Sequence, residues 1–286
     1  MKNFKPTFMI RPFAETNIVV AGFGRNGGVT NWKTLINGPF DKERERLAKQ
    51  LKLFLRQHNV DSVYAPTTSK FNAQVVSHNE TTEDYKCGLH TGVTAEGLDV
   101  PTKSAVVFFP ADCNTVVIRA QSGHLIANHA GGFSLIDYKL AIDHTVQPRE
   151  FASVVDAVVA RFDELRDGPK TLSVFIVRGV SASNFGYNPS DETLGAHNLK
   201  LLDAFRSINP SVVVGENGGV DITKVIRLQF EKHGVPSHQI QTDATDTYND
   251  LDSDNDYTWW SHERAKNVGN DNEAVGCRNM VLVLNP

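Results

Sequence analysis

Short apolar runs alternate along this chain with longer segments in which apolar residues recur every three or four positions, the two patterns that distinguish strands from helices. Strands are predicted at residues 17–23, 61–65, 106–109, 115–118, 125–127, 172–177 and 276–284. Helices are predicted at residues 41–58, 151–165, 198–208 and 221–234. The alternation has no internal repeat and no Pro/Ser linker. We therefore expect a single α/β (α+β) domain over residues 1–286, with mixed β-sheets flanked by helices.

Residues that start and stop helices stand at the ends of these segments. Asp41 and Asp221 precede two of them, and a side-chain oxygen at that position accepts backbone N–H groups. Gly234 follows the second segment, where glycine commonly ends a helix. The sequence Asp-Gly-Pro at residues 167–169 stops the segment 151–165, which is the clearest helix of the chain.

Composition and charge narrow the classes of function. The 286 residues carry a net charge of -4 with acidic and basic residues well mixed, so nothing marks a nucleic-acid or anionic-membrane surface. A small molecule is the expected partner of a monomer or homodimer. Three cysteines do not suggest a disulfide framework. No apolar run approaches the about 18 residues of a membrane span, and the first residues lack a signal-like apolar core, so we expect a cytoplasmic protein.

Two apolar runs end on residues that can bind a metal or act in nucleophilic chemistry. The first run, from Val106, leads to Asp112 and Cys113, and the second leads to His129. The strands between them are hinged at residues 121–123, which brings Cys113 and His129 to the same sheet margin. A buried structural thiol with a core histidine is the common meaning of such a pair, and a reactive site is the alternative.

Other segments carry weaker signals. Arg25 lies in the glycine-rich turn 24–30, where a guanidinium can hold an anion, although such turns are common without a ligand. Tyr187 is the bulky amphipathic residue of the polar loop 181–189. The acidic residues at 242–256 lack the glycine and glutamate of a calcium loop and are interpreted as a solvated surface.

Five separated motifs together resemble those of one family, in the same order. They are residues 22–30, Phe109-Pro-Ala-Asp-Cys113, Ile126-Ala-Asn-His-Ala-Gly-Gly132, residues 178–187, and Trp259-Trp-Ser-His-Glu-Arg264 with Gly276-Cys-Arg278. The family is the YfiH type, once described as multicopper polyphenol oxidase or laccase and associated with zinc-dependent purine nucleoside phosphorolysis and adenosine deamination. The resemblance covers nearly the whole chain, and we expect a YfiH-like fold.

The resemblance implies a Zn²⁺ site of one cysteine and two histidines, with an open position for water or phosphate. Cys113 and His129 match two of these ligands and would be catalytic together with Asp112. Phosphate would attack the anomeric carbon of a purine nucleoside. The residues implied in binding substrate are Arg25, Tyr187, Arg264 and Arg278, with the arginines holding phosphate.

The chain departs from the family pattern at the first histidine. The family carries it in Gln-Val-His-Gly, and by strand order Ser69 takes its place here. His78 stands 35 residues before Cys113, close to the family's separation, and is the candidate third ligand. The tryptophan and arginine expected after the His-Ala-Gly are also missing, which removes positive charge.

Three hypotheses follow from these residues. The first is a zinc-dependent purine nucleoside phosphorylase with adenosine deaminase activity. The second is a divergent member that binds nucleoside or metal without catalysis. The third is a metal-free hydrolase or deamidase with Cys113 as nucleophile and His129 as base. Copper-dependent laccase chemistry is not expected, because the chain has no His-x-His motif.

Overall fold

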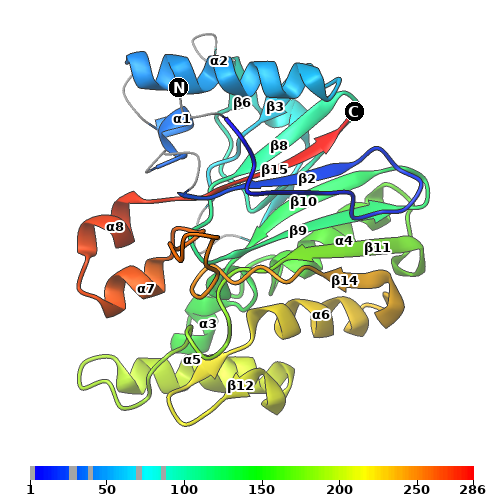
Figure 1. The fold of residues 1–286 in the computed structure, drawn as a ribbon. Coiled ribbons are helices and arrows are strands. Elements are labelled where there is room, and N and C mark those ends of the chain that lie inside the picture. Colours follow the sequence, from blue (N-terminus) through cyan, green and yellow to red (C-terminus); the bar gives the residue numbers. More distant parts are fainter. Residues whose placement is uncertain (1–3, 26–30, 38–40, 69–72, 85–87) are drawn as a thin grey trace.

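The computed structural model describes residues 4–25, 31–37, 41–68, 73–84 and 88–286. Two β-sheets are stacked on one another, with helix α2 (Lys42–Gln57) over the outer face of one sheet and α4 (Val154–Glu164) and α6 (Ile222–Lys232) over the outer face of the other (Figure 1). The described residues thus form four layers, and the expected fold class of mixed sheets flanked by helices is confirmed.

The first sheet combines antiparallel and parallel pairs. Its order is β1 (Phe8–Ile10), β2 (Val19–Phe23), β15 (Met280–Asn285), β8 (Ser104–Phe108), β3 (Ser62–Tyr64), β6 (Leu89–Thr91) and β5 (Thr82–Asp84). The neighbours from β1 to β8 are antiparallel, β8, β3 and β6 are parallel, and β5 is antiparallel to β6. The last strand, β15, therefore lies between β2, near the start of the chain, and β8.

The second sheet carries the candidate site. Its order is β14 (Ile240–Thr242), β11 (Leu172–Val177), β9 (Asn114–Ala120), β10 (Leu125–Ala130), β7 (Gly97–Asp99) and β4 (Val75–Val76). Strands β9 and β10 form the predicted hairpin, and β7 and β11 flank it on either side. A separate pair, β12 (Val213–Val214) and β13 (Gly219–Val220), lies beyond the helices of this side.

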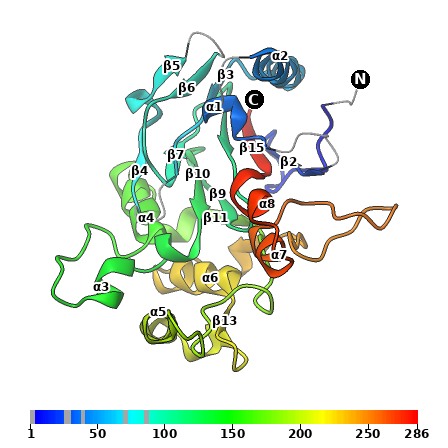
Figure 2. The same ribbon diagram turned by 90° about the vertical axis from the view of Figure 1, so that its left-hand side faces the viewer.

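The remaining helices are shorter or lie farther out. They are α1 (Thr34–Asn37), α3 (Tyr138–Ile142), α5 (Gly195–Ile208), α7 (His262–Asn267) and α8 (Asp271–Gly276). In the view of Figure 2, α5 and α6 lie at one end of the layers and α2 at the other. Within the described ranges, no helix combines the length and the apolar character that crossing a bilayer requires.

The helix ends follow the predicted caps, but two helices start at other residues, α4 at Val154 and α5 at Gly195 instead of at residue 198. The carboxylates of Asp41 and Asp221 accept the N–H groups of Arg44 and Lys224, as expected of N-caps. Gly234 takes a φ of 91°, where glycine avoids strain. Helix α4 begins at Val154 instead of at residue 151, because Ser153 caps it in a reciprocal pair of hydrogen bonds with its third residue.

The end of the chain differs from the sequence prediction. Residues 271–276 form α8, and the last strand begins at Met280 instead of at residue 276. Asn270 caps this short helix through its side chain, which accepts the N–H of Glu273. A cap followed by a helix of less than two turns leaves too few apolar residues for a periodic signal.

The alternation of side chains along β9 and β10 decides which residues face the space between the sheets. Val117 and Ala127 belong to the apolar cluster between the sheets, and Ile118 and Ile126 belong to the cluster under α4 and α6. By the same parity, Thr115 and His129 face the inter-sheet side. His129 therefore emerges at the margin of a buried layer.

Candidate active site

Cys113 and His129 meet at one margin of the second sheet, as predicted. Cys113 directly precedes β9, and the register pairs His129 with Thr115 and Ala130 with Asn114 across the hairpin. A Cβ built on Gly131 would lie 3.0 Å from Cys113 Sγ and 3.3 Å from His129 Cε1, so both side chains close over this glycine. Figure 2 looks onto this margin, beside α7 and α8.

Glu96 is the third residue of this site. Its side chain is fully buried, and Oε2 lies 2.6 Å from His129 Nδ1. The backbone N–H of His129 also donates to the carbonyl of Glu96, at 2.7 Å. Because Glu96 immediately precedes β7, the neighbour of β10, sheet pairing holds the carboxylate beside the imidazole. We call the three side chains Glu96, His129 and Cys113 the relay.

The relay favours a protonated imidazole. Burial alone lowers the pKa of His129, but the charges of Cys113 and Glu96 and hydrogen bonds to both raise it to about 10. A thiolate and a carboxylate on either side of one imidazole stabilise its cationic form. The arrangement has the order of a nucleophile, a base and a group that orients the base.

Glu96 was not found by the sequence analysis. Its only local signal is a single carboxylate next to Ala95 and close to Leu98, in a stretch without a catalytic motif. A charged residue among small and apolar residues is often buried against a partner, but the partner here is 33 residues away. The pairing of β7 with β10 supplies that link, which no local pattern contains.

Tyr187 lies beside the relay. A Cβ built on Gly132 would lie 2.6 Å from the hydroxyl oxygen of Tyr187. The phenol therefore lies next to Gly132, three residues after His129. Burial, and next the charges of Cys113, Glu263 and Tyr138, raise the pKa of Tyr187 above its ordinary value. The phenol therefore stays protonated and can donate a hydrogen bond to a ligand. Its predicted contact with substrate stays a prediction.

Asp112 is buried and holds two other segments. Its carboxylate accepts the Thr247 hydroxyl at 2.7 Å and the backbone N–H of Glu263 at 2.8 Å. Burial raises the pKa of Glu263, Lys266 opposes that shift and Asp112 adds to it. Asp112 thus links α7 to Cys113, the next residue in the chain. Its expected catalytic role stays a prediction.

The three arginines predicted to bind phosphate differ in what they contact. The guanidinium of Arg264 is buried and donates to the carbonyls of residues 247, 248 and 259, while its plane lies 3.7 Å from the Tyr257 ring centre. Arg278 donates to the carbonyls of residues 274 and 277. Arg25 keeps about a third of its side chain exposed (34%), 4.4 Å over the Trp260 ring and 3.9 Å from Glu273. Arg25 is thus more accessible than the buried Arg264.

His78, the candidate third zinc ligand, does not join the relay. It lies in a short 3-10 helix and its Nδ1 is 3.1 Å from Asp99 Oδ2. Asp99 pairs with Ile126 at the other end of β10 from His129. Within the ranges that the structure covers, His, Cys, Asp and Glu side chains form no group of three able to hold a metal ion. Ser69 and residues 26–30 lie outside the described residues.

Gly131 offers a direct test of the relay geometry. Gly131→Ala would place a methyl group 3.0 Å from Cys113 Sγ, closer than ordinary van der Waals contact. We expect the thiol to move, so that the rate of its alkylation by iodoacetamide changes by about tenfold. Gly123→Ala is not a suitable control because φ is 103° there, whereas Gly168→Ala meets nothing within 4 Å. Equal labelling rates in Gly131→Ala and the Gly168→Ala control would contradict the geometry.

Comparisons with known proteins agree with this architecture. A sequence model of the family described as multi-copper polyphenol oxidoreductase laccase matches residues 24–278. No protein with a curated description matches the sequence.

Three solved structures share the fold. The Bacillus licheniformis hypothetical protein YfiH has 14% identity and a TM-score of 0.65, covering 93% of this chain and 92% of its own. A Neisseria meningitidis protein of family DUF152 has 18% identity and a TM-score of 0.64, covering 98% and 99%. YlmD from Geobacillus stearothermophilus has 16% identity and a TM-score of 0.64, covering 96% and 93%. At these identities the likeness concerns the fold alone.

Proposed function

Since this chain belongs to the multi-copper polyphenol oxidoreductase laccase family, whose YfiH-type members share its fold, we propose that it is an enzyme that hydrolytically deaminates a purine nucleoside at the relay of Glu96, His129 and Cys113. One observation carries the proposal: the fully buried carboxylate of Glu96 lies 2.6 Å from the imidazole that hydrogen-bonds Cys113. A thiolate held beside an imidazolium is a competent nucleophile with its proton donor in place.

The reaction is a substitution at an amidine carbon. The Cys113 thiolate adds to C6 of the adenine ring, and the ring nitrogen beside that carbon takes up a proton from solvent, to which one proton is returned when the product is released. His129 donates its proton to the exocyclic amine, the carbon–nitrogen bond breaks, and ammonia leaves. Water then adds to the same carbon with His129 as base, the carbon–sulfur bond breaks, and the hydroxypurine is released. One water is consumed and one ammonia is formed, with no change of oxidation state.

The charge around the relay supports deamination over phosphorolysis. The buried carboxylate of Glu96 contacts His129, and the carboxylate of Asp112, the residue before Cys113, accepts the N–H of Glu263. Two of the three candidate phosphate-binding arginines donate to backbone carbonyls. A phosphate dianion entering this site would meet like charge. A neutral purine with an amino group and ring nitrogens finds hydrogen-bond partners instead.

A zinc centre fits the described residues only in part. Catalytic zinc in proteins takes three side-chain ligands and one open position. Cys113 and His129 supply two donors of the right kind, but among the described residues they belong to no group of three His, Cys, Asp or Glu side chains able to hold a metal ion. The nearby Glu96 carboxylate contacts His129 Nδ1. The proposed reaction therefore assigns no step to zinc.

Zinc-dependent phosphorolysis of a purine nucleoside is the second candidate. The contact of His129 with a buried carboxylate favours it, because metal-binding histidines commonly donate their other ring N–H to such a group. The partly exposed guanidinium of Arg25 is available for an anion. This candidate requires a third zinc ligand from outside the described residues.

One experiment separates the two candidates. The protein is dialysed against a strong chelator, its zinc content is measured, and it is incubated with adenosine in four conditions, with or without added zinc and with or without phosphate. We expect ammonia and inosine from metal-free protein, with no dependence on phosphate. Release of adenine that requires both added zinc and phosphate would establish the second candidate instead. Absence of either product under all four conditions would contradict both.

A further inference from the structure

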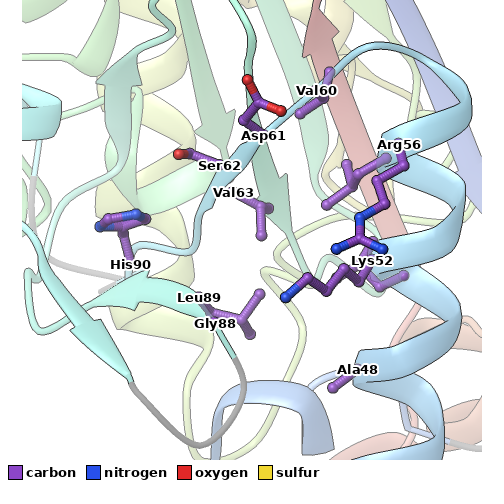
Figure 3. Close-up of a pocket in the computed structure, with 12 residues that line it drawn as sticks. Ala48, Lys52, Arg56, Val60, Asp61, Ser62, Val63, Gly88, Leu89 and His90 are labelled. Carbon is purple, nitrogen blue, oxygen red and sulfur yellow. The ribbon is translucent and has the colours of Figure 1, made fainter.

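A cleft with a volume of about 450 Å³ lies between α2 and the strands β3 and β6. This volume lies within the range of small-molecule sites in proteins, about 300 to 1,000 Å³. Figure 3 shows Lys52 and Arg56 reaching from α2 toward Val63, Gly88 and Leu89 across the cleft. None of its residues belongs to the relay.

The strand register separates this cleft from the relay. Strand β3 runs parallel to β8, and Ser62 pairs with Ser104 at the start of β8. Cys113 follows the other end of β8, beyond Phe108. The cleft therefore opens at the opposite end of the central strand from the thiol, and a ligand in it would not contact Cys113.

Behind the cleft lie closely packed aliphatic side chains, while most of the surface that its lining exposes is polar. Its aliphatic lining residues are each less than a tenth exposed: Leu51, Leu55, Val60, Val63 and Leu89. His90 adds an imidazole whose ring centre is 4.7 Å from that of Tyr64. An apolar or aromatic ligand group seated here would remove its own apolar surface from water.

The wall of the cleft carries two cations whose charge is not neutralised within the described residues. Lys52 and Arg56 are one helical turn apart on α2, so their side chains share a face. Elsewhere on this helix, Lys49 pairs with Glu45 at 2.7 Å and Arg44 donates to the carbonyl of Leu35 at 3.0 Å. Neither Lys52 nor Arg56 forms an ion pair with another described residue, and Asp61 is the acidic side chain among the described lining residues.

We propose that this cleft binds a small phosphate monoester with an apolar or aromatic body. The phosphate lies between Lys52 and Arg56, where the guanidinium offers a paired set of donors and the ammonium a point charge. The body lies on Leu89 and Val63, beside His90. Asp61 disfavours a second anionic group at the other end of the cleft, which selects ligands with one phosphate. The proposal does not depend on the reaction at the relay.

Calorimetric titration with phenyl phosphate tests this site in the full chain. We expect saturable binding with a dissociation constant below about 1 mM. Inorganic phosphate, which lacks the body, and benzyl alcohol, which lacks the charge, should each bind at least about tenfold more weakly. Raising the salt concentration should weaken phenyl phosphate binding. No saturable heat at about 10 mM phenyl phosphate, or equal affinity for inorganic phosphate, would overturn the proposal.

Matched variants locate the binding. Lys52→Gln with Arg56→Gln should weaken phenyl phosphate binding by about tenfold or more, since two charge-assisted contacts are lost. Lys49→Gln lies on the same helix and removes a cation that is already paired, so it should leave the affinity unchanged. Cys113→Ala should also bind as the wild type does. Unchanged affinity in the double variant, with circular dichroism showing an intact fold, would refute the site.

Discussion

Cys113→Ser is expected to lower kcat/KM for adenosine deamination by about 1,000-fold or more, which corresponds to about 4 kcal/mol of transition-state stabilisation. A serine hydroxyl beside the same imidazole is a much weaker nucleophile than a thiolate, because it is not ionised at neutral pH. The substitution is nearly isosteric, and Cys113 is only partly buried, so the fold should be retained. Ammonia release measured with chelator-treated protein checks the result.

Cys277 provides the matched control. It is also a free, partly buried cysteine, and burial and the charge of Glu273 raise the pKa of its thiol. Cys277→Ser should retain the wild-type rate of deamination and should still be inactivated by iodoacetamide. A Cys113→Ser variant that keeps more than about a tenth of the wild-type kcat/KM would exclude Cys113 as the nucleophile.

Glu96→Gln is expected to reduce kcat by about 100-fold to 10,000-fold with a smaller change in KM. Glutamine has the same shape but no charge, so burial is then opposed by Cys113 only and the pKa of His129 falls from about 10. The cationic form of His129 beside Cys113 is less favoured, and the imidazole loses the charged group that fixes its orientation. The rate of Cys113 alkylation between pH 6 and pH 9 measures this loss directly.

The same variant changes how stability depends on pH. The folded-state pKa of His129 is raised from 6.5 to about 10, so its contribution to the free energy of unfolding is full below about pH 6.5 and is lost as the pH rises through about 10. The difference in unfolding midpoint between wild type and Glu96→Gln should therefore be largest near pH 6 and should narrow toward pH 10.

Glu231→Gln is the control for a carboxylate elsewhere. Glu231 lies 3.9 Å from Arg227 on α6, and its side chain is partly exposed. This substitution should change neither the alkylation profile of Cys113 nor the pH dependence of the unfolding midpoint. A Glu96→Gln variant that behaves like Glu231→Gln would show that Glu96 has no influence on the imidazole.

The fold class and the four longest helices, α2, α4, α5 and α6, followed from local patterns. Asp41 and Asp221 cap helices because an N-cap hydrogen bond spans only three residues and depends on little else. The start of α4 at Val154 and the helix at residues 271–276 were not predicted from the sequence. Short capped segments are decided by one or two side-chain hydrogen bonds, which apolar periodicity does not record.

The pairing of Cys113 with His129 also followed from the sequence, because a hairpin with a short turn fixes its own register. The position of a third zinc ligand did not follow from the sequence. His78 stands at a suitable distance along the chain, but the parallel pairing of β4 with β7 carries it to Asp99. Separation in sequence does not determine which end of a strand a residue reaches.

The sequence by itself therefore determined the layered α/β class, the main helices with their caps and the hairpin that joins Cys113 to His129. These features depend on periodicity, on caps and on one tight turn, all of which act over a few residues. Tertiary structure alone decided that Glu96 orients His129, that Arg264 and Arg278 donate to backbone carbonyls, and that Lys52 and Arg56 line a cleft. The contact of Glu96 with His129 and the cleft between α2, β3 and β6 join elements that are separated in sequence, and sheet order and packing set their partners. The arginine contacts span shorter stretches, but apolar periodicity does not record which carbonyls a guanidinium reaches.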